Sequence, residues 1–108
     1  MKIAEIAKSE EIPAGEMKRF LIEGKEILVV NYEGRYYAMD EKCTHRGGDL
    51  SEGKLEGNIL TCPLHGSKFD ITTGKNVSGP KLGFLKLKIK DETSYKVNSE
   101  NGIIKISI

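Results

Sequence analysis

Two short boxes in the middle of the chain hold both of its cysteines and both of its histidines. The boxes read Cys43-Thr44-His45 and Cys62-Pro63-Leu64-His65, and sixteen residues separate His45 from Cys62. Thiolates and imidazoles are the side chains that bind zinc, copper and iron–sulfur clusters, and four of them complete one tetrahedral set or two half sets. The pattern predicts a metal centre whose ligands are Cys43, His45, Cys62 and His65.

The spacing within the boxes favours a binuclear centre over a single ion. One residue between Cys43 and His45 is tight for chelation of one tetrahedral ion, and zinc fingers usually pair like ligands two to five residues apart. With two bridged irons, the two thiolates hold one metal and the two imidazoles hold the other. A zinc site on the same Cys₂His₂ set stays open as an alternative, and the chain would then be a structural binding module.

These two boxes resemble those of the Rieske iron–sulfur family, in which two Cys bind the inner iron and two His bind the outer one. The resemblance implies one [2Fe–2S] cluster held by the four residues named above. It also implies an all-β fold, with an antiparallel sandwich or barrel as the base and an inserted cluster-binding lobe. We expect a single domain over residues 1–108, with the lobe at about residues 42–80.

Two further positions resemble the soluble ferredoxin branch of that family. The cytochrome bc-type branch carries an extra Cys in each box, joined in a disulfide, and this chain has Gly48 and Leu64 at those places. The resemblance implies a soluble one-electron carrier between a reductase and an oxygenase or another redox enzyme, and not an enzyme by itself. The Rieske-like small subunit of a nitrite reductase is a second alternative, although such subunits commonly lack the ligands.

The run Gly66-Ser67-Lys68-Phe69-Asp70 also resembles the ferredoxin branch, because Phe69 stands where high-potential members carry Tyr. Hydrogen bonds to the sulfurs raise the reduction potential, and Phe69 has no donor. Ser67 keeps one possible donor. We expect a potential in the low part of the Rieske range of roughly −150 to +300 mV.

Three residues are expected to border the exposed tip of the centre, where the two histidine edges would give the electron a short path into a partner. They are Arg46, Leu64 and Pro80, and the resemblance places Pro80 in a loop that covers the cluster. The proline ring restricts backbone motion there.

Short extended runs, separated by glycine turns, make up the rest of the chain. The first group forms a predicted three-stranded meander over residues 17–22, 25–32 and 35–39. Alternating Leu or Ile with Lys predicts a strand over residues 85–90. A closing hairpin is expected from residues 94–98 and 102–108, across a turn at 99–101. A helical turn is possible after Ser9, limited by Pro13.

The bulk composition narrows the partner classes. The chain has 108 residues, 17 basic and 16 acidic, with a net charge of +1, so no strong field favours nucleic acid or an anionic membrane. The longest apolar run, Ile27 to Val30, is far below the roughly 20 residues that span a bilayer, and the first residues do not resemble a secretory signal. We expect a cytoplasmic monomer whose partners are redox proteins.

Overall fold

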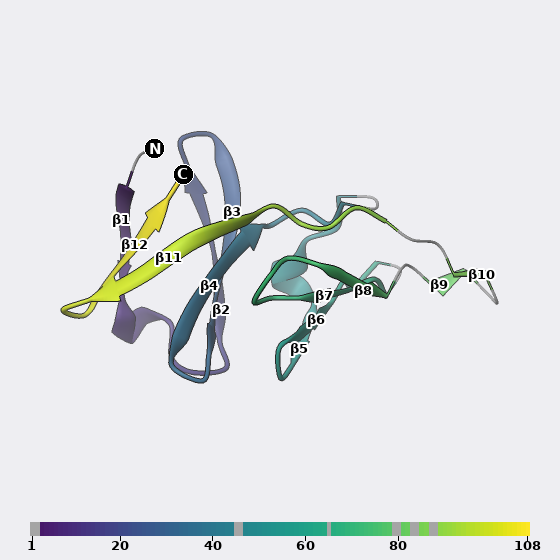
Figure 1. Cartoon of the computed structure of the whole chain (residues 1–108), viewed down its shortest axis with the longest axis horizontal. Helices are drawn as coiled ribbons and strands as arrows, with labels where there is room; N and C mark the ends of the chain where they lie inside the picture. Colours follow the sequence, from purple (N-terminus) through teal and green to yellow (C-terminus); the bar gives the residue numbers. More distant parts are fainter. Residues whose placement is uncertain (1–2, 45–46, 65, 79–80, 83–84, 87–88) are drawn as a thin grey trace.

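The fold consists almost entirely of short antiparallel strands (Figure 1). The computed structural model describes residues 3–44, 47–64, 66–78, 81–82, 85–86 and 89–108. The strands are β1 (Ile3–Lys8), β2 (Met17–Ile22), β3 (Lys25–Tyr32), β4 (Arg35–Asp40), β5 (Lys54–Glu56), β6 (Ile59–Thr61), β7 (Lys68–Asp70), β8 (Asn76–Ser78), β9 (Lys81–Leu82), β10 (Leu85–Lys86), β11 (Ser94–Glu100) and β12 (Ile103–Ser107). Two 3₁₀ turns, η1 (Ser9–Glu11) and η2 (Leu50–Glu52), complete the described elements, and none of the helical segments described is long and apolar enough to cross a bilayer.

The base is a six-stranded sheet in the order β1-β12-β11-β4-β3-β2. Strand β11 joins its two halves, because its first residues pair with β4 and the rest pair with β12. The predicted meander is confirmed as β2, β3 and β4, and Figure 1 shows these strands rising beside the long diagonal of β11. The chain therefore closes the base with residues from both of its ends.

A second, four-stranded sheet in the order β5-β6-β7-β8 is inserted in the sequence between β4 and β11. In Figure 1 it lies beside the base, and the small β9–β10 pair lies beyond it. The predicted all-β class, an antiparallel base with an inserted lobe, is confirmed. The strands of the lobe have three residues each, which is too short for an alternating pattern to stand out in the sequence.

Strand β3 explains how the base and the lobe are held together. Ile27 and Val29 point into one buried cluster with Ile104 and Ile106, which is the interior of the base. Leu28 belongs to a second buried cluster on the opposite face, together with residues of the lobe. A strand that is buried on both faces reads as a continuous apolar run instead of an alternation, and this accounts for the run from Ile27 to Val30.

Three expectations about elements were wrong or incomplete. The strand predicted over residues 85–90 is present only at Leu85–Lys86, residues 87–88 lie outside the described part, and Ile89 and Lys90 are irregular. The last hairpin turns at Asn101 and Gly102, both with positive φ, so β11 runs on to Glu100. Strand β1 was not predicted. A helical turn was expected after Ser9, and the 3₁₀ turn η1 begins at Ser9 itself.

Candidate metal centre

Each predicted box lies in a six-residue loop closed by an antiparallel pair. The first loop, residues 43–48, is closed by the bridge between Lys42 and Asp49. The second loop, residues 62–67, connects β6 to β7, and Thr61 pairs with Lys68 at its base. Cys43 and Cys62 are therefore equivalent positions, the first residue of each loop.

The two loops also share one backbone hydrogen-bond pattern. The amide of Cys43 donates to the Gly48 carbonyl at 2.8 Å, and the Gly47 amide donates back to the Cys43 carbonyl at 2.8 Å. In the second loop Cys62 donates to Ser67 at 2.7 Å, and Gly66 donates to Cys62 at 3.2 Å.

Two of these glycines have the left-handed backbone that the shared pattern uses. The φ angles are +69° at Gly47 and +77° at Gly66, a region that side chains other than glycine rarely adopt. Each loop thus folds back on its cysteine in the same way, and Gly66 has a backbone role as well as its place in the motif.

The loops approach each other at Gly48. A Cβ atom added to Gly48 would lie 2.9 Å from Cys62 Sγ and 3.0 Å from two carbon atoms of the Leu64 side chain. Only a residue without a side chain fits this approach. Gly48 and Leu64 were predicted to stand where a bracing disulfide lies in other proteins, and here they are in direct contact instead.

Both thiols lie inside the cluster of apolar residues that joins the lobe to the base. Cys43 and Cys62 are each 3% exposed, and the two are not joined in a disulfide. Phe69, which is fully buried, belongs to the same cluster. Ser67 is 1% exposed, and its hydroxyl has no hydrogen-bond partner among the described residues.

The two buried thiols, and the unsatisfied buried hydroxyl in the second loop, suit an iron–sulfur cluster. Unpaired polar atoms are rare inside proteins and call for an explanation, and the Ser67 hydroxyl is available to a sulfur acceptor. No described atom lies within 4 Å of a Cβ built on Gly47, so a group that is not side chain can approach the backbone there. The described residues therefore fit the predicted cluster.

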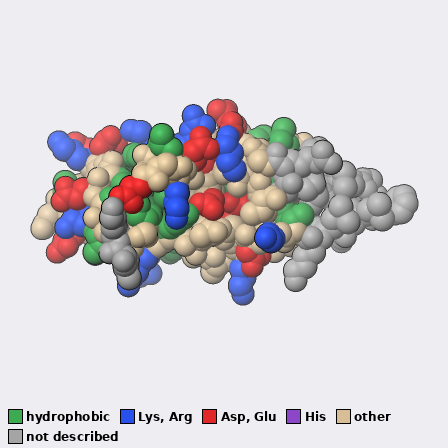
Figure 2. Space-filling model, turned by 90° about the horizontal axis from the view of Figure 1, so that it is seen from above, with side chains coloured by type: hydrophobic (Ala, Val, Ile, Leu, Met, Phe, Trp, Pro, Cys, Tyr) green, Lys and Arg blue, Asp and Glu red, His purple; other side chains and the backbone are tan. Residues whose placement is uncertain are grey.

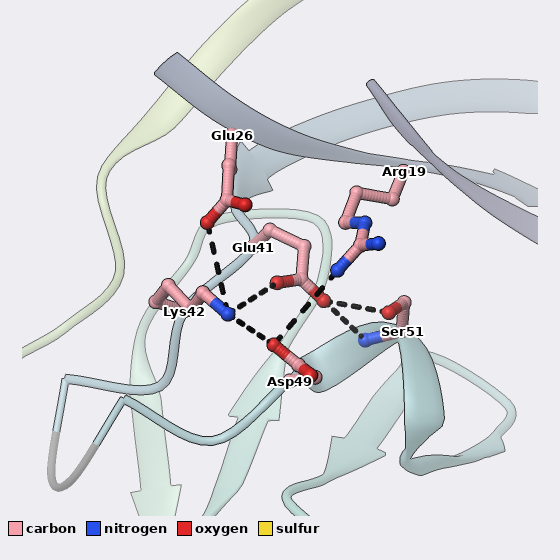
Figure 3. Close-up of polar contacts among 6 residues, drawn as sticks. All are labelled: Arg19, Glu26, Glu41, Lys42, Asp49 and Ser51. Atoms are coloured by element: carbon pink, nitrogen blue, oxygen red, sulfur yellow. Dashed lines mark hydrogen bonds and ion pairs between the residues drawn. The ribbon is translucent and has the colours of Figure 1, made fainter. Parts of the chain in front are cut away.

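A network of charged side chains secures the base of the first loop (Figure 3). Glu41 is fully buried, and its Oε1 accepts hydrogen bonds from the amide and the hydroxyl of Ser51 at 3.0 and 2.6 Å. Lys42 binds Asp49 and lies 3.7 Å from Glu26 and 3.8 Å from Glu41.

The pairing across the loop shifts the pKa values of the residues at its two ends. The hydrogen bond from Lys42 holds the pKa of Asp49 below its ordinary value, and the same bond raises the pKa of Lys42. These side chains are substantially exposed, so their pairing contributes little to the free energy of folding by itself. Its role is to fix the register in which the loop leaves and rejoins the sheet.

Thr44 connects the first loop to the segment that precedes β11. Its amide donates to Glu92 Oε2 at 2.8 Å, and its hydroxyl donates to the Lys90 carbonyl at 2.6 Å. Burial, with a smaller effect from the negative charges of Asp40 and Glu41, raises the pKa of Glu92 to about 7 against the hydrogen bonds from Thr44.

The structure places some of the predicted site residues and not others. Leu64, a predicted border of the tip, is 55% exposed. His45, Arg46, His65 and Pro80, all predicted from the sequence, lie outside the described residues.

Sequence reasoning missed Thr44, Glu92 and Glu41. A pattern along the chain could not have found the first two, because their contact spans 48 positions. For Glu41 the sequence did carry a signal, because this acidic residue lies two positions before the first cysteine and directly after β4.

Comparison with known proteins connects this geometry to a family. The family model for the Rieske [2Fe–2S] domain matches residues 2–88. The ferredoxin component of naphthalene 1,2-dioxygenase/salicylate 5-hydroxylase systems from Ralstonia sp is 39% identical over 92 residues, 85% of this chain and 82% of that protein. The ferredoxin component of the naphthalene 1,2-dioxygenase system from Pseudomonas putida is 36% identical over 101 residues, 94% of this chain and 90% of that protein.

Solved structures show the same fold. The ferredoxin of Sphingomonas yanoikuyae B1 superposes with a TM-score of 0.80 at 26% identity, covering 99% of each chain. The ferredoxin of carbazole 1,9a-dioxygenase from Nocardioides aromaticivorans IC177 gives 0.83 at 22% identity, covering 99% of this chain and 98% of that one. The family match, the identities and the paired loops agree, and the chain belongs to the Rieske [2Fe–2S] domain family.

Proposed function

We propose that the chain is a one-electron carrier that holds its [2Fe–2S] cluster with Cys43 and Cys62 on one iron and His45 and His65 on the other. The observation that supports this ligand set most is the pair of matching six-residue loops. Each begins with a buried cysteine, contains one histidine in its sequence, and contacts the other loop at Gly48.

The cluster, when bound, supplies a one-electron redox couple. The residues decide its charge: two thiolates and two neutral imidazoles carry two fewer negative charges than four thiolates, so that an added electron is better tolerated. The apolar cluster around both thiols keeps water away, and the Ser67 hydroxyl offers a donor to sulfur. Both features tune the potential of an iron–sulfur centre.

The partners follow from the relatives and from the surface. The curated relatives are ferredoxin components of dioxygenase systems, and we propose that this chain likewise passes electrons from a reductase to an oxygenase or a similar redox enzyme in the cytoplasm. Figure 2 shows acidic and basic side chains interspersed over one face of the molecule. Exposed Leu64 then offers the apolar contact point next to the cluster loops.

Metal and sulfide analysis tests the proposal directly. Protein purified under mild, oxygen-free conditions should contain about two irons and two acid-labile sulfides per chain. After reduction it should give the EPR spectrum of a histidine-ligated [2Fe–2S] centre. Equimolar zinc without sulfide would reject the electron carrier and favour the structural zinc module.

Replacing one histidine tests the ligand assignment. The variant His65→Cys adds one negative charge to the centre, so its potential should fall by about 100 mV or more if a cluster assembles. Glu56→Cys, which adds a thiol on the exposed face of β5, is the control and should leave the potential within a few tens of millivolts of wild type. An unchanged potential in His65→Cys would show that His65 is not a ligand.

A further inference from the structure

Glu92 is a buried carboxyl group that the proposed electron-transfer chemistry does not use. It is 4% exposed, and no lysine or arginine of the described residues forms an ion pair with it. Its Oε1 has no hydrogen-bond partner in the described part of the chain. Burying an unpaired carboxyl group costs free energy, so its retention calls for a compensating role.

The contacts of the other carboxyl oxygen indicate that role. Glu92 Oε2 accepts the Thr44 amide at 2.8 Å, and two residues earlier the Lys90 carbonyl accepts the Thr44 hydroxyl at 2.6 Å. Both bonds end on the single residue between Cys43 and His45. The two hydrogen bonds therefore hold the loop at the point between two of the proposed ligands.

The segment that contains Glu92 is in turn hydrogen-bonded to the inserted lobe. The Glu92 amide donates to the Gly74 carbonyl at 2.7 Å, and a Cβ on Gly74 would lie 2.5 Å from the Glu92 carbonyl oxygen. Asp91 Oδ1 accepts the Asn76 amide at 2.8 Å. The segment is therefore fixed to the turn and strand that follow the second loop's β7, and it cannot shift without disturbing the lobe.

We propose that Glu92 is a positioning residue for the first cluster-binding loop: its carboxyl group fixes the Thr44 amide and, through it, the backbone between Cys43 and His45. This sets how the two ligands are presented, and with it the reduction potential. The expected effect on the reduction potential rests on the proposed function, whereas the contact between Glu92 and Thr44 does not.

Two nearly isosteric variants separate position from charge. Glu92→Gln keeps an oxygen that can accept the Thr44 amide, with its NH₂ group at the unpaired Oε1 position, whereas Glu92→Met keeps the volume and offers only a weak thioether acceptor. Asp40→Asn is the matched control, since Asp40 is a nearby carboxylate that accepts from the Tyr95 hydroxyl and not from Thr44.

The measurements are hydrogen exchange by mass spectrometry on overlapping peptides across residues 41–48, the midpoint potential at one fixed pH, and the EPR line width. In Glu92→Met we expect exchange at Thr44 to be about tenfold faster or more. The potential should shift beyond that of Asp40→Asn, and the EPR signal should broaden. Glu92→Gln should retain the protection within about twofold and resemble Asp40→Asn in potential. Peptides across residues 62–67 should not change in either variant.

Three results would overturn the proposal. The first is wild-type exchange and potential in Glu92→Met. The second is an equal loss of protection from exchange in Glu92→Gln and Glu92→Met, which would assign the effect to the charge of Glu92. If Glu92→Met does not fold, Glu92→Asp replaces it, because it retracts the acceptor by one methylene and should change exchange and potential in the same direction. Wild-type exchange and potential in Glu92→Asp is the third result. Protein without iron and sulfide would defeat the proposed function, while the exchange data would still decide the contact.

Discussion

Ser67 carries a buried hydroxyl for which the described residues supply no acceptor. If that hydroxyl donates to a sulfur, Ser67→Ala should lower the midpoint potential by about 40 mV, the one-electron equivalent of about 1 kcal/mol for one hydrogen bond. The melting temperature should change little, because no described protein contact is lost. Protein-film voltammetry and thermal unfolding measure the two quantities, and an unchanged potential would show that the hydroxyl does not serve the cluster.

Phe69 offers the opposite test, because it is fully buried and has no donor. Phe69→Tyr should raise the potential by about 40 mV if the new hydroxyl reaches a sulfur, with stability preserved. Phe20→Tyr, on half-buried β2 and in the other apolar cluster, is the control and should leave the potential unchanged. A stability loss of about 1–3 kcal/mol without a rise in potential would mean that the hydroxyl is buried without a partner.

Candidate residues that lie close together in the sequence could be found from their types and spacing, whereas contacts between residues far apart in the sequence could not. Cys43 and Cys62 were identified from their types and spacing, and they lie buried in equivalent loop positions. The bond from Thr44 to Glu92 joins positions 48 apart and has no local pattern. The ligand roles of all four residues stay predictions, and both histidines lie outside the described residues.

Strands were predictable where glycine turns bound them at both ends. Strands β2 to β4 followed from their glycine turns, whose Glu23-Gly24 and Glu33-Gly34 pairs have the positive φ that such hairpins need. The strand predicted over residues 85–90 failed at its end because the Lys90 carbonyl accepts the Thr44 hydroxyl instead of a neighbouring strand. Alternation of Leu, Ile and Lys reports which side is buried, and it does not report the backbone partner.

The contact between the two loops makes Gly48 the most constrained glycine of the site. A methyl group there would meet Cys62 Sγ at 2.9 Å, so Gly48→Ala should force the loops apart, lower the iron content and speed the loss of the cluster's visible absorbance several-fold. Gly57→Ala is the control, since Gly57 has φ +61° with open space around it. It should cost about 1 kcal/mol of stability and leave iron content intact. Equal iron content in both variants would contradict a close contact at Gly48.

At the scale of the whole molecule, one sheet serves two apolar clusters. Ile27 and Val29 stabilise the base, while Leu28 and Val30 pack against the lobe that carries both cysteines. The site is thus built on the back of the strands that hold the base together. Unfolding of the base and loss of the cluster are therefore expected to be one cooperative event.

The pH dependence of stability follows from Glu92, because its pKa of about 7 in the folded protein lies above its ordinary value of 4.5. Between these values the folded state binds more protons than the unfolded state, so the free energy of unfolding should fall as the pH rises from about 4.5 to 7 and then level off. Ionisation of Glu92 is expected to lower the free energy of unfolding by about 3 kcal/mol across this range. Glu92→Gln cannot titrate, and the difference in melting temperature between wild type and this variant should therefore shrink or reverse across that window. The remaining carboxylates and the histidines are common to both proteins and cancel in the difference. A difference in melting temperature that stays constant from pH 5 to 8 would contradict a pKa of Glu92 raised to about 7.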